Sequence, residues 1–172
     1  TGRRSRRILV EITAENLADK YHISREEQDA FAALSQQKAL AAIESGRFDS
    51  EIIPVSIAQK KSAAILFNQD QGPRPGTSAE GLARLPAVFK QGGSVTAGNA
   101  SGLNDGAAAV IVCSRQQADK LGLEPLVTIK AWANAGVDPA IMGIGPVSAT
   151  RRVLAKAGWT LDEVDLIEAN EA

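Results

Sequence analysis

The spacing of apolar and polar positions changes along the chain, and the first part is typical of helices. Capping residues and spaced apolar positions predict helices over residues 13–21 and 24–46. Thr13 is expected to cap the first of these, with Glu15 in its first turn, where a carboxylate favours the helix dipole. Two pairs have the spacing of a capping box: Ser24 with Glu27, and Thr160 with Glu163.

The next segment is less regular. Residues 51–58 are strand-like, and Pro54 favours an edge position because proline cannot donate to a strand ladder. Residues 59–78 are polar and contain two prolines, which predicts a long loop of the functional or mobile kind. A short helix is expected over residues 79–85.

The second part of the chain alternates apolar runs with short helical segments. Residues 107–113 form a continuous apolar run, typical of a strand covered on both faces, and further strands are expected over 126–136 and 164–172. Helices are expected over residues 114–122 and 145–158, with Gly122 and Gly158 as their stop signals. This alternation predicts an α/β fold with a covered sheet.

Composition narrows the class of protein. The chain has 172 residues with 19 Lys+Arg and 20 Asp+Glu, and this balance argues against nucleic acid or an anionic membrane as partner. Aromatic residues make up only 4%, so the core should consist of aliphatic side chains. No apolar run approaches the roughly 20 residues that cross a bilayer. One cysteine and one histidine argue against a metal site, and the lone cysteine fits a reducing, cytoplasmic compartment.

A stretch of small residues, 94–106, precedes the first apolar run. A backbone lined by glycine and alanine lets a thin ligand come close, although a glycine-rich turn feeding a strand would look the same. Three polar residues within it are expected to fix the loop through side-chain to backbone hydrogen bonds: Asn99, Asn104 and Asp105.

Two motifs, "SVTAGNASGLNDGAAAVIVCSR" and "DLIEANEA", resemble the thiolase family, as do "TAENLADKYHISREEQD" and "GVDPAIMGIGPVSATRRVLAKAGW" in the same order. The resemblance covers nearly the whole chain from Thr13 onward and implies part of the layered α/β/α/β/α thiolase fold. It implies four segments: an unmatched basic arm (1–12), a loop-domain portion (13–92), the end of the N-terminal half (93–122) and a truncated start of the C-terminal half (123–172).

The resemblance also implies an activity. Thiolases are acetyl-CoA acetyltransferases or 3-ketoacyl-CoA thiolases, which move acyl groups between coenzyme A (CoA) thioesters by Claisen condensation or thiolysis, with no cofactor beyond CoA as substrate. Full-length members are homodimers or tetramers. Their nucleophilic cysteine precedes the matching region, and their histidine base and second cysteine follow it, so we expect this chain to be inactive alone. The alternative is a non-catalytic module that binds CoA or a thiolase partner.

The matching motifs carry the family's site residues onto this chain. Asn170 resembles the catalytic asparagine that orients a water in an oxyanion hole, a contribution on the order of 3 kcal/mol. Ser101 resembles the serine that hydrogen-bonds the pantetheine arm, and Ala97 a wall of that channel. Arg74 resembles a contact to the CoA adenine and phosphates, and the alternative is a surface arginine on a mobile loop. The remaining substrate-binding candidates are Phe89, Leu103, Met142 and Ala172, of which Phe89 and Met142 could equally be core residues. We expect Ser101 and Asn170 to share one cleft.

Overall fold

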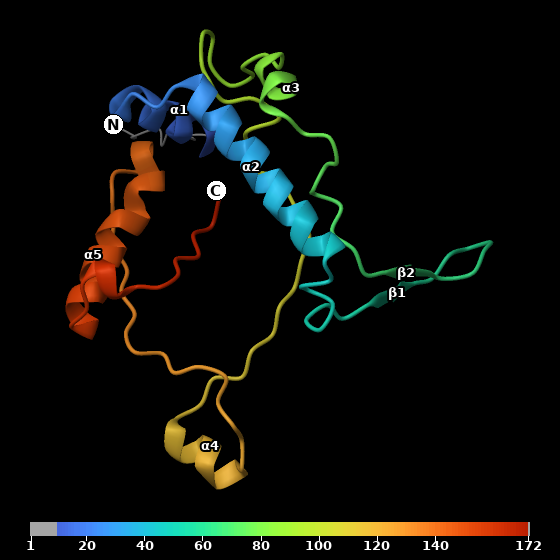
Figure 1. The fold of residues 1–172 in the computed structure, drawn as a ribbon, viewed down its shortest axis with the longest axis vertical. Coiled ribbons are helices and arrows are strands. Elements are labelled where there is room, and N and C mark those ends of the chain that lie inside the picture. Colours follow the sequence, from blue (N-terminus) through green and yellow to red (C-terminus); the bar gives the residue numbers. More distant parts are fainter. Residues whose placement is uncertain (1–9, 172) are drawn as a thin grey trace, which may run out of the picture. The chain divides into compact units, whose positions relative to one another are not determined.

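A computed structural model describes residues 10–171 of the chain (Figure 1). The described residues divide into two units, which are considered separately. One unit is Ala14–Gly102, and the other takes Leu103 onward together with the residues up to Thr13. Most of the basic segment at the start of the chain, and Ala172 at its end, lie outside the described residues.

Three helices organise the unit Ala14–Gly102: α1 (Val10–Tyr21), α2 (Arg25–Glu44) and α3 (Ala79–Ala83). The capping box at the start of α2 is confirmed, since the Ser24 side chain accepts the Glu27 amide and the Glu27 carboxylate accepts the Ser24 amide. Helix α3 packs beside α2 (Figure 1).

The predicted start of the first helix is wrong. Thr13 lies inside α1, and its hydroxyl donates to the carbonyl of Val10, 2.6 Å away. A threonine hydroxyl can return to the carbonyl of the preceding turn as readily as it can cap a helix, so the residue type alone did not fix its position.

A short antiparallel hairpin follows α2. Strand β1 (Val55–Ile57) pairs with β2 (Ile65–Phe67), with Val55 opposite Phe67. Of the strand predicted over residues 51–58, only Val55–Ile57 forms, whereas β2 falls inside residues 59–78, which were expected to be loop. All six strand residues are exposed. The hairpin therefore has no buried face, and its sequence need not show the alternation of apolar and polar residues that predicts a half-buried strand.

Between residues 103 and 171, the other unit has four helices: α4 (Arg115–Leu121), η1 (Pro139–Ile144), α5 (Gly145–Ala157) and η2 (Leu161–Glu163). The helices predicted at α4 and α5 are confirmed together with their glycine stops, since Gly122 and Gly158 are left-handed with φ of 66° and 71°. The capping box of Thr160 and Glu163 forms at η2.

The three strands predicted in this unit are not formed. Within the described residues, 107–113, 126–136 and 164–171 carry no strand, and the chain there is drawn as a plain thread (Figure 1). Most of their apolar side chains are exposed, 89% in the case of Ile111, while a few such as Ala131 and Val164 are half-buried. A strand requires hydrogen bonds to a neighbouring strand, and the described residues provide no such neighbour for these segments.

The buried side chains are few and of mixed polarity. The buried apolar residues are Ala18, Ala33, Leu82, Val95 and Ala118. The buried polar residues are Thr13, Glu15, Asp29 and Thr96. Helix α2 therefore buries a carboxylate and an alanine, while its large apolar residue Phe31 is 62% exposed. Among residues 10–171, no helix combines the length and apolar character needed to cross a membrane.

Candidate functional site

A buried carboxylate holds the start of the small-residue stretch. Glu15 on α1 is only 1% exposed. Its two carboxylate oxygens accept the amide of Ser94 at 3.0 Å each, and one of them accepts the amide of Val95 at 2.8 Å. The Ser94 hydroxyl also lies 3.3 Å from this carboxylate and accepts a 2.9 Å bond from the Gln28 amide on α2. Charge-assisted bonds of this kind are stronger than neutral ones, so they fix the backbone at residues 94 and 95.

A second buried carboxylate holds the following turn. Asp29 on α2 is 2% exposed and accepts a 2.9 Å bond from the side-chain amide of Asn99. The same Asn99 amide donates to the carbonyl of Ser94, and the Asn99 side-chain oxygen accepts the amide of Thr96 at 2.7 Å. The prediction that Asn99 fixes the loop is confirmed; for Asn104 and Asp105 it stays a prediction.

Arg25 links this aspartate to α3. Its Nε donates to Asp29 at 2.7 Å, and its Nη2 donates to the carbonyls of Leu82 and Leu85 at 2.7 and 2.9 Å. These carbonyls lie at or just after the end of α3. The Leu82 carbonyl also accepts the backbone amide of Leu85 at 2.9 Å, so the guanidinium adds a second bond there. One ion pair therefore connects α2, the end of α3 and, through Asn99, the turn before Ser101.

Two glycines, one just before the small-residue stretch and one within it, leave space that side chains of the same protein occupy. A Cβ at Gly93 would lie within 3.0 Å of the Glu15 carboxylate. A Cβ at Gly98 would lie 2.5 Å from methyl groups of both Leu82 and Leu85. At these two positions the small residue serves internal packing, whereas Ala97 between them is exposed and open to a ligand.

Four of the predicted site residues belong to the unit Ala14–Gly102. Ser101 is exposed, and its hydroxyl donates a 3.4 Å bond to the neighbouring Gly102 carbonyl. Ala97 lies on the same turn. Phe89 is half-buried. Arg74 is exposed, and its backbone amide donates to the side chain of Gln36 on α2 at 2.7 Å, which ties this part of the loop to the helix.

The other predicted site residues belong to the second unit. Leu103 is fully exposed, Met142 on η1 is 40% exposed and Asn170 is exposed in the segment after η2. Ala172 lies outside the described residues. The expected cleft shared by Ser101 and Asn170 stays a prediction, because the two residues belong to different units.

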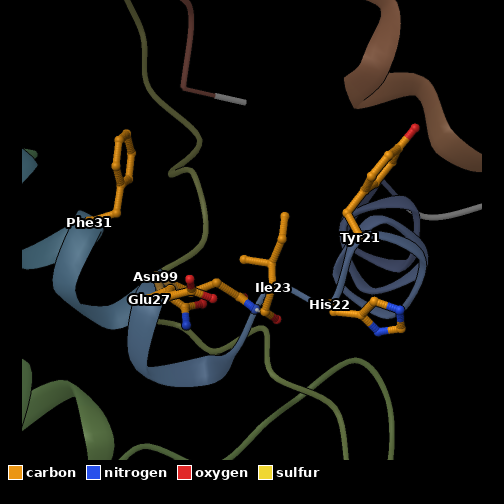
Figure 2. A pocket seen from close by; sticks show the side chains of 7 residues that line it. Tyr21, His22, Ile23, Glu27, Phe31 and Asn99 are labelled. Carbon is orange, nitrogen blue, oxygen red and sulfur yellow. Dashed lines mark hydrogen bonds between the residues drawn. The ribbon is translucent and has the colours of Figure 1, made fainter.

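A hollow of about 450 Å³ lies where α1 turns into α2. Figure 2 shows Tyr21 and His22 at the end of α1 and Phe31 on α2. His22 is exposed and has a left-handed φ of 57°, as befits the turn between the helices. None of the predicted site residues lines the hollow, but Gln28 and Asn99 do, so it borders the network that holds the small-residue stretch.

The pKa shifts among the described residues are caused chiefly by hydrogen bonds. The Ser24 backbone amide, together with its hydroxyl, lowers the pKa of Glu27, and Thr160 lowers the pKa of Glu163 in the same way. A hydrogen bond to Asp19 raises the pKa of Lys90. Glu27 and Glu163 cap helix ends, and Lys90 forms an exposed ion pair with Asp19. The described residues contain no cluster of three or more His, Cys, Asp or Glu side chains that could hold a metal ion.

Comparison with known protein families accounts for both units. Residues 4–116 match the thiolase N-terminal domain and residues 123–172 match the thiolase C-terminal domain. The chain belongs to the thiolase family. The first match begins within the segment 1–12 that the sequence set apart, and the division of the chain into four segments stays a prediction.

Curated relatives with high sequence identity to the chain include acetyl-CoA acetyltransferases. The chain is 64% identical over 161 residues to the acetyl-CoA acetyltransferase of Pseudomonas aeruginosa and 58% identical to that of Chromobacterium violaceum. Each alignment covers 94% of this chain and 41% of the relative. The chain therefore spans about two fifths of the length of these relatives.

Solved structures agree with the predicted fold. The Bacillus anthracis acetyl-CoA acetyltransferase matches with a TM-score of 0.91 and 48% identity, over 95% of this chain and 41% of that one. Human mitochondrial 3-ketoacyl-CoA thiolase matches with a TM-score of 0.90 and 47% identity, over 96% and 41% respectively. The α/β thiolase fold expected from the sequence is confirmed.

The sequence analysis did not predict that Glu15, Arg25 and Asp29 hold the small-residue stretch. Glu15 was interpreted as a helix-dipole residue, because its partners lie 79 and 80 positions away. The spacing of Arg25 and Asp29 by four residues does indicate a helical ion pair, but it does not distinguish a buried pair from an exposed one.

Proposed function

We propose that this chain supplies part of the CoA site of a thiolase that transfers acyl groups between CoA thioesters. The reaction is the condensation of two acetyl-CoA molecules or the thiolysis of a 3-ketoacyl-CoA. The observation that carries this proposal is the 64% identity with an acetyl-CoA acetyltransferase across 94% of the chain. The rigidly held turn that ends in the exposed hydroxyl of Ser101 supports it.

The proposed roles are those that the resemblance to thiolases implies, and each is compatible with the chemistry of the side chain. The Ser101 hydroxyl is free to hydrogen-bond an amide of the pantetheine arm, with the open face of Ala97 beside it. Arg74 carries a planar guanidinium that can pair with the phosphates of CoA. Asn170 would place a water against the thioester oxygen, where negative charge develops as the thioester is attacked. Phe89, Leu103, Met142 and Ala172 would line the apolar part of the channel.

The chain alone should not turn over substrate. The single cysteine, Cys113, is the last residue of an apolar run, and the single histidine, His22, lies at an exposed helix turn. Thiolysis by way of a cysteine thioester needs an activated thiol and a base within hydrogen-bond reach of each other. We therefore assign activity to the longer thiolase, which we place in the cytoplasm as a homo-oligomer.

The test uses a hybrid thiolase, in which this chain replaces the 161 matched residues of the Pseudomonas aeruginosa enzyme. Loss of the acetoacetyl-CoA enolate absorbance in the presence of CoA reports thiolysis. The hybrid thiolase should be active, and Asn170→Ala should lower kcat by about 100- to 1000-fold. Ser101→Ala should raise the KM for CoA about fivefold with little change in kcat, as expected for one lost neutral hydrogen bond.

Two results would contradict the proposal. One is a folded hybrid thiolase without thiolysis. The other is turnover by the 172-residue chain on its own, which would overturn the assignment of the missing nucleophile and base. CoA binding by the isolated chain without turnover, measured by calorimetry, would favour the non-catalytic binding module.

A further inference from the structure

We propose that Glu15 is a positioning residue for the CoA site, acting with the Arg25–Asp29 ion pair on the backbone that leads to Ser101. This inference rests on the proposed function, because it assigns a purpose to the loop that presents the serine. It concerns residues that the family resemblance did not single out. The argument depends on contacts within the unit Ala14–Gly102 only.

The first step is the burial of Glu15. A carboxylate that is 1% exposed loses its water, and this loss is costly unless donors replace the water. Here the replacement comes from two consecutive backbone amides and one hydroxyl of the loop. Because consecutive amides point at one carboxylate only in a particular local backbone conformation, these bonds define the conformation at residues 94 and 95.

The second step is the close approach of the loop to α1. The absence of a side chain at Gly93 lets the backbone come next to the carboxylate. Any larger residue would displace Glu15 from the amides. The sequence thus contains both halves of the clamp, an acid on α1 and a glycine on the loop, although 78 positions separate them.

The third step extends the clamp to the turn before the serine. Asp29 holds the Asn99 side chain, which bridges the carbonyl of Ser94 and the amide of Thr96. The Thr96 hydroxyl in turn accepts the amides of Gly98 and Asn99 at 3.1 and 3.3 Å. Residues 94–99 are therefore fixed from both ends before any ligand arrives, and the open hydroxyl of Ser101 follows two residues later.

The functional consequence is pre-organisation. A loop that already has its bound conformation loses less conformational freedom when the ligand binds. Loosening the clamp should therefore weaken CoA binding without touching the reacting atoms. A positioning residue of this kind affects KM and leaves kcat nearly unchanged.

The experiment combines Glu15→Gln in the 172-residue chain with the same change in the hybrid thiolase. In the chain, we expect amide hydrogen exchange at Ser94 and Val95 to accelerate about tenfold, because glutamine offers one neutral acceptor in place of two charged oxygens. In the hybrid thiolase, we expect the KM for CoA to rise about fivefold and kcat to change less than about twofold. Gln28→Ala, which removes the 2.9 Å bond to the Ser94 hydroxyl and a 3.3 Å bond to the Ile23 carbonyl but leaves the Glu15 carboxylate in place, should give a smaller change in the same direction.

Two controls separate positioning from general destabilisation and from failure of the proposed function. Ala118→Gly lowers helix stability at a buried site of α4 and should leave the KM for CoA unchanged. Faster exchange with an unchanged KM in Glu15→Gln would overturn the proposal. If Ser101→Ala leaves KM unchanged, the proposed role of the serine fails instead, and the exchange at Ser94 and Val95 still decides whether Glu15 orders the loop.

Discussion

Two neighbouring stretches of this chain behave in opposite ways. Residues 93–101 are rich in small and polar side chains, yet Val95 and Thr96 within them are buried, at 5% and 0% exposure. Residues 107–113 are almost entirely apolar, yet Val110 and Ile111 are 85% and 89% exposed. Apolar content therefore does not identify the ordered part of this polypeptide.

The difference lies in the partners that each stretch has within the chain. The polar stretch is held by Glu15 and Asp29, buried carboxylates from two helices that precede it. The apolar stretch would need neighbouring strands to bond to and helices to cover it. Within the described residues, no strand pairs with it. An internal polar network can order a loop, whereas an apolar strand is ordered only by its surroundings.

The largest effect is expected from removing the buried ion pair. Asp29→Ala leaves the Arg25 guanidinium largely buried without its partner and frees Asn99, so the free energy of unfolding of this unit should fall by about 3 kcal/mol. Urea unfolding followed by circular dichroism measures it.

The second unit provides a matched control for that variant. Arg115 and Asp119 form an ion pair of the same spacing at 2.9 Å, but their side chains are 75% and 59% exposed. Asp119→Ala should change the free energy of unfolding by less than about 0.5 kcal/mol. Equal losses from Asp29→Ala and Asp119→Ala would show that burial of the first pair contributes nothing.

A methyl group at Gly98 should have the next largest effect. Gly98→Ala forces a Cβ against Leu82 and Leu85 and should destabilise the unit by about 2 kcal/mol through overpacking. Gly106→Ala is the control, because nothing lies within 4 Å of the added Cβ. Thermal unfolding of the two variants side by side checks the difference; a tolerated Gly98→Ala would mean that the turn is not packed against α3.

A smaller loss is expected at the start of α2. Ser24→Ala removes the side-chain oxygen that accepts the Glu27 amide, which should lower the free energy of unfolding by about 1 kcal/mol. Amide exchange at Glu27 reports this loss locally, and exchange in the hairpin β1–β2 should stay unchanged.

The capping boxes also predict a pH dependence with a definite sign. The pKa of Glu27 is lowered in the folded chain relative to 4.5, chiefly by the Ser24 amide, and the pKa of Glu163 is lowered by Thr160. A lowered folded pKa contributes stability above the unfolded pKa, and this contribution is lost as the pH falls through the lower, folded value. Exchange at the first turn of α2 should accelerate below about pH 4.5, and Glu27→Gln should remove that dependence.

The smallest effect is expected in the apolar stretch. Ile111→Ser replaces a side chain that is 89% exposed, so the free energy of unfolding should change by less than about 0.5 kcal/mol. In the hybrid thiolase the same change should cost about 2 to 4 kcal/mol if the rest of that enzyme covers this segment. No difference between the two proteins would contradict the idea that surroundings decide its order.

Local signals in the sequence were sufficient for most of the α-helices, although not for the start of α1 or for η1, and insufficient for the strands and the clamp. Helix ends depend on neighbouring residues, so Ser24, Gly122 and Gly158 mark them correctly. Strands depend on remote partners, so the apolar run over 107–113 predicts a propensity that this chain does not realise. The same limit applied to Glu15, whose partners lie far along the chain, while Asn99 was foreseen because its partner Thr96 lies three residues away.

Residue-resolved amide hydrogen exchange of the unmodified 172-residue chain tests the central claim most directly. The account predicts that the amides of Ser94, Val95 and Thr96 exchange at least about 100-fold more slowly than those of residues 107–113, which should exchange at nearly unprotected rates. Rapid exchange at Ser94 and Val95, or strong protection throughout 107–113, would contradict it.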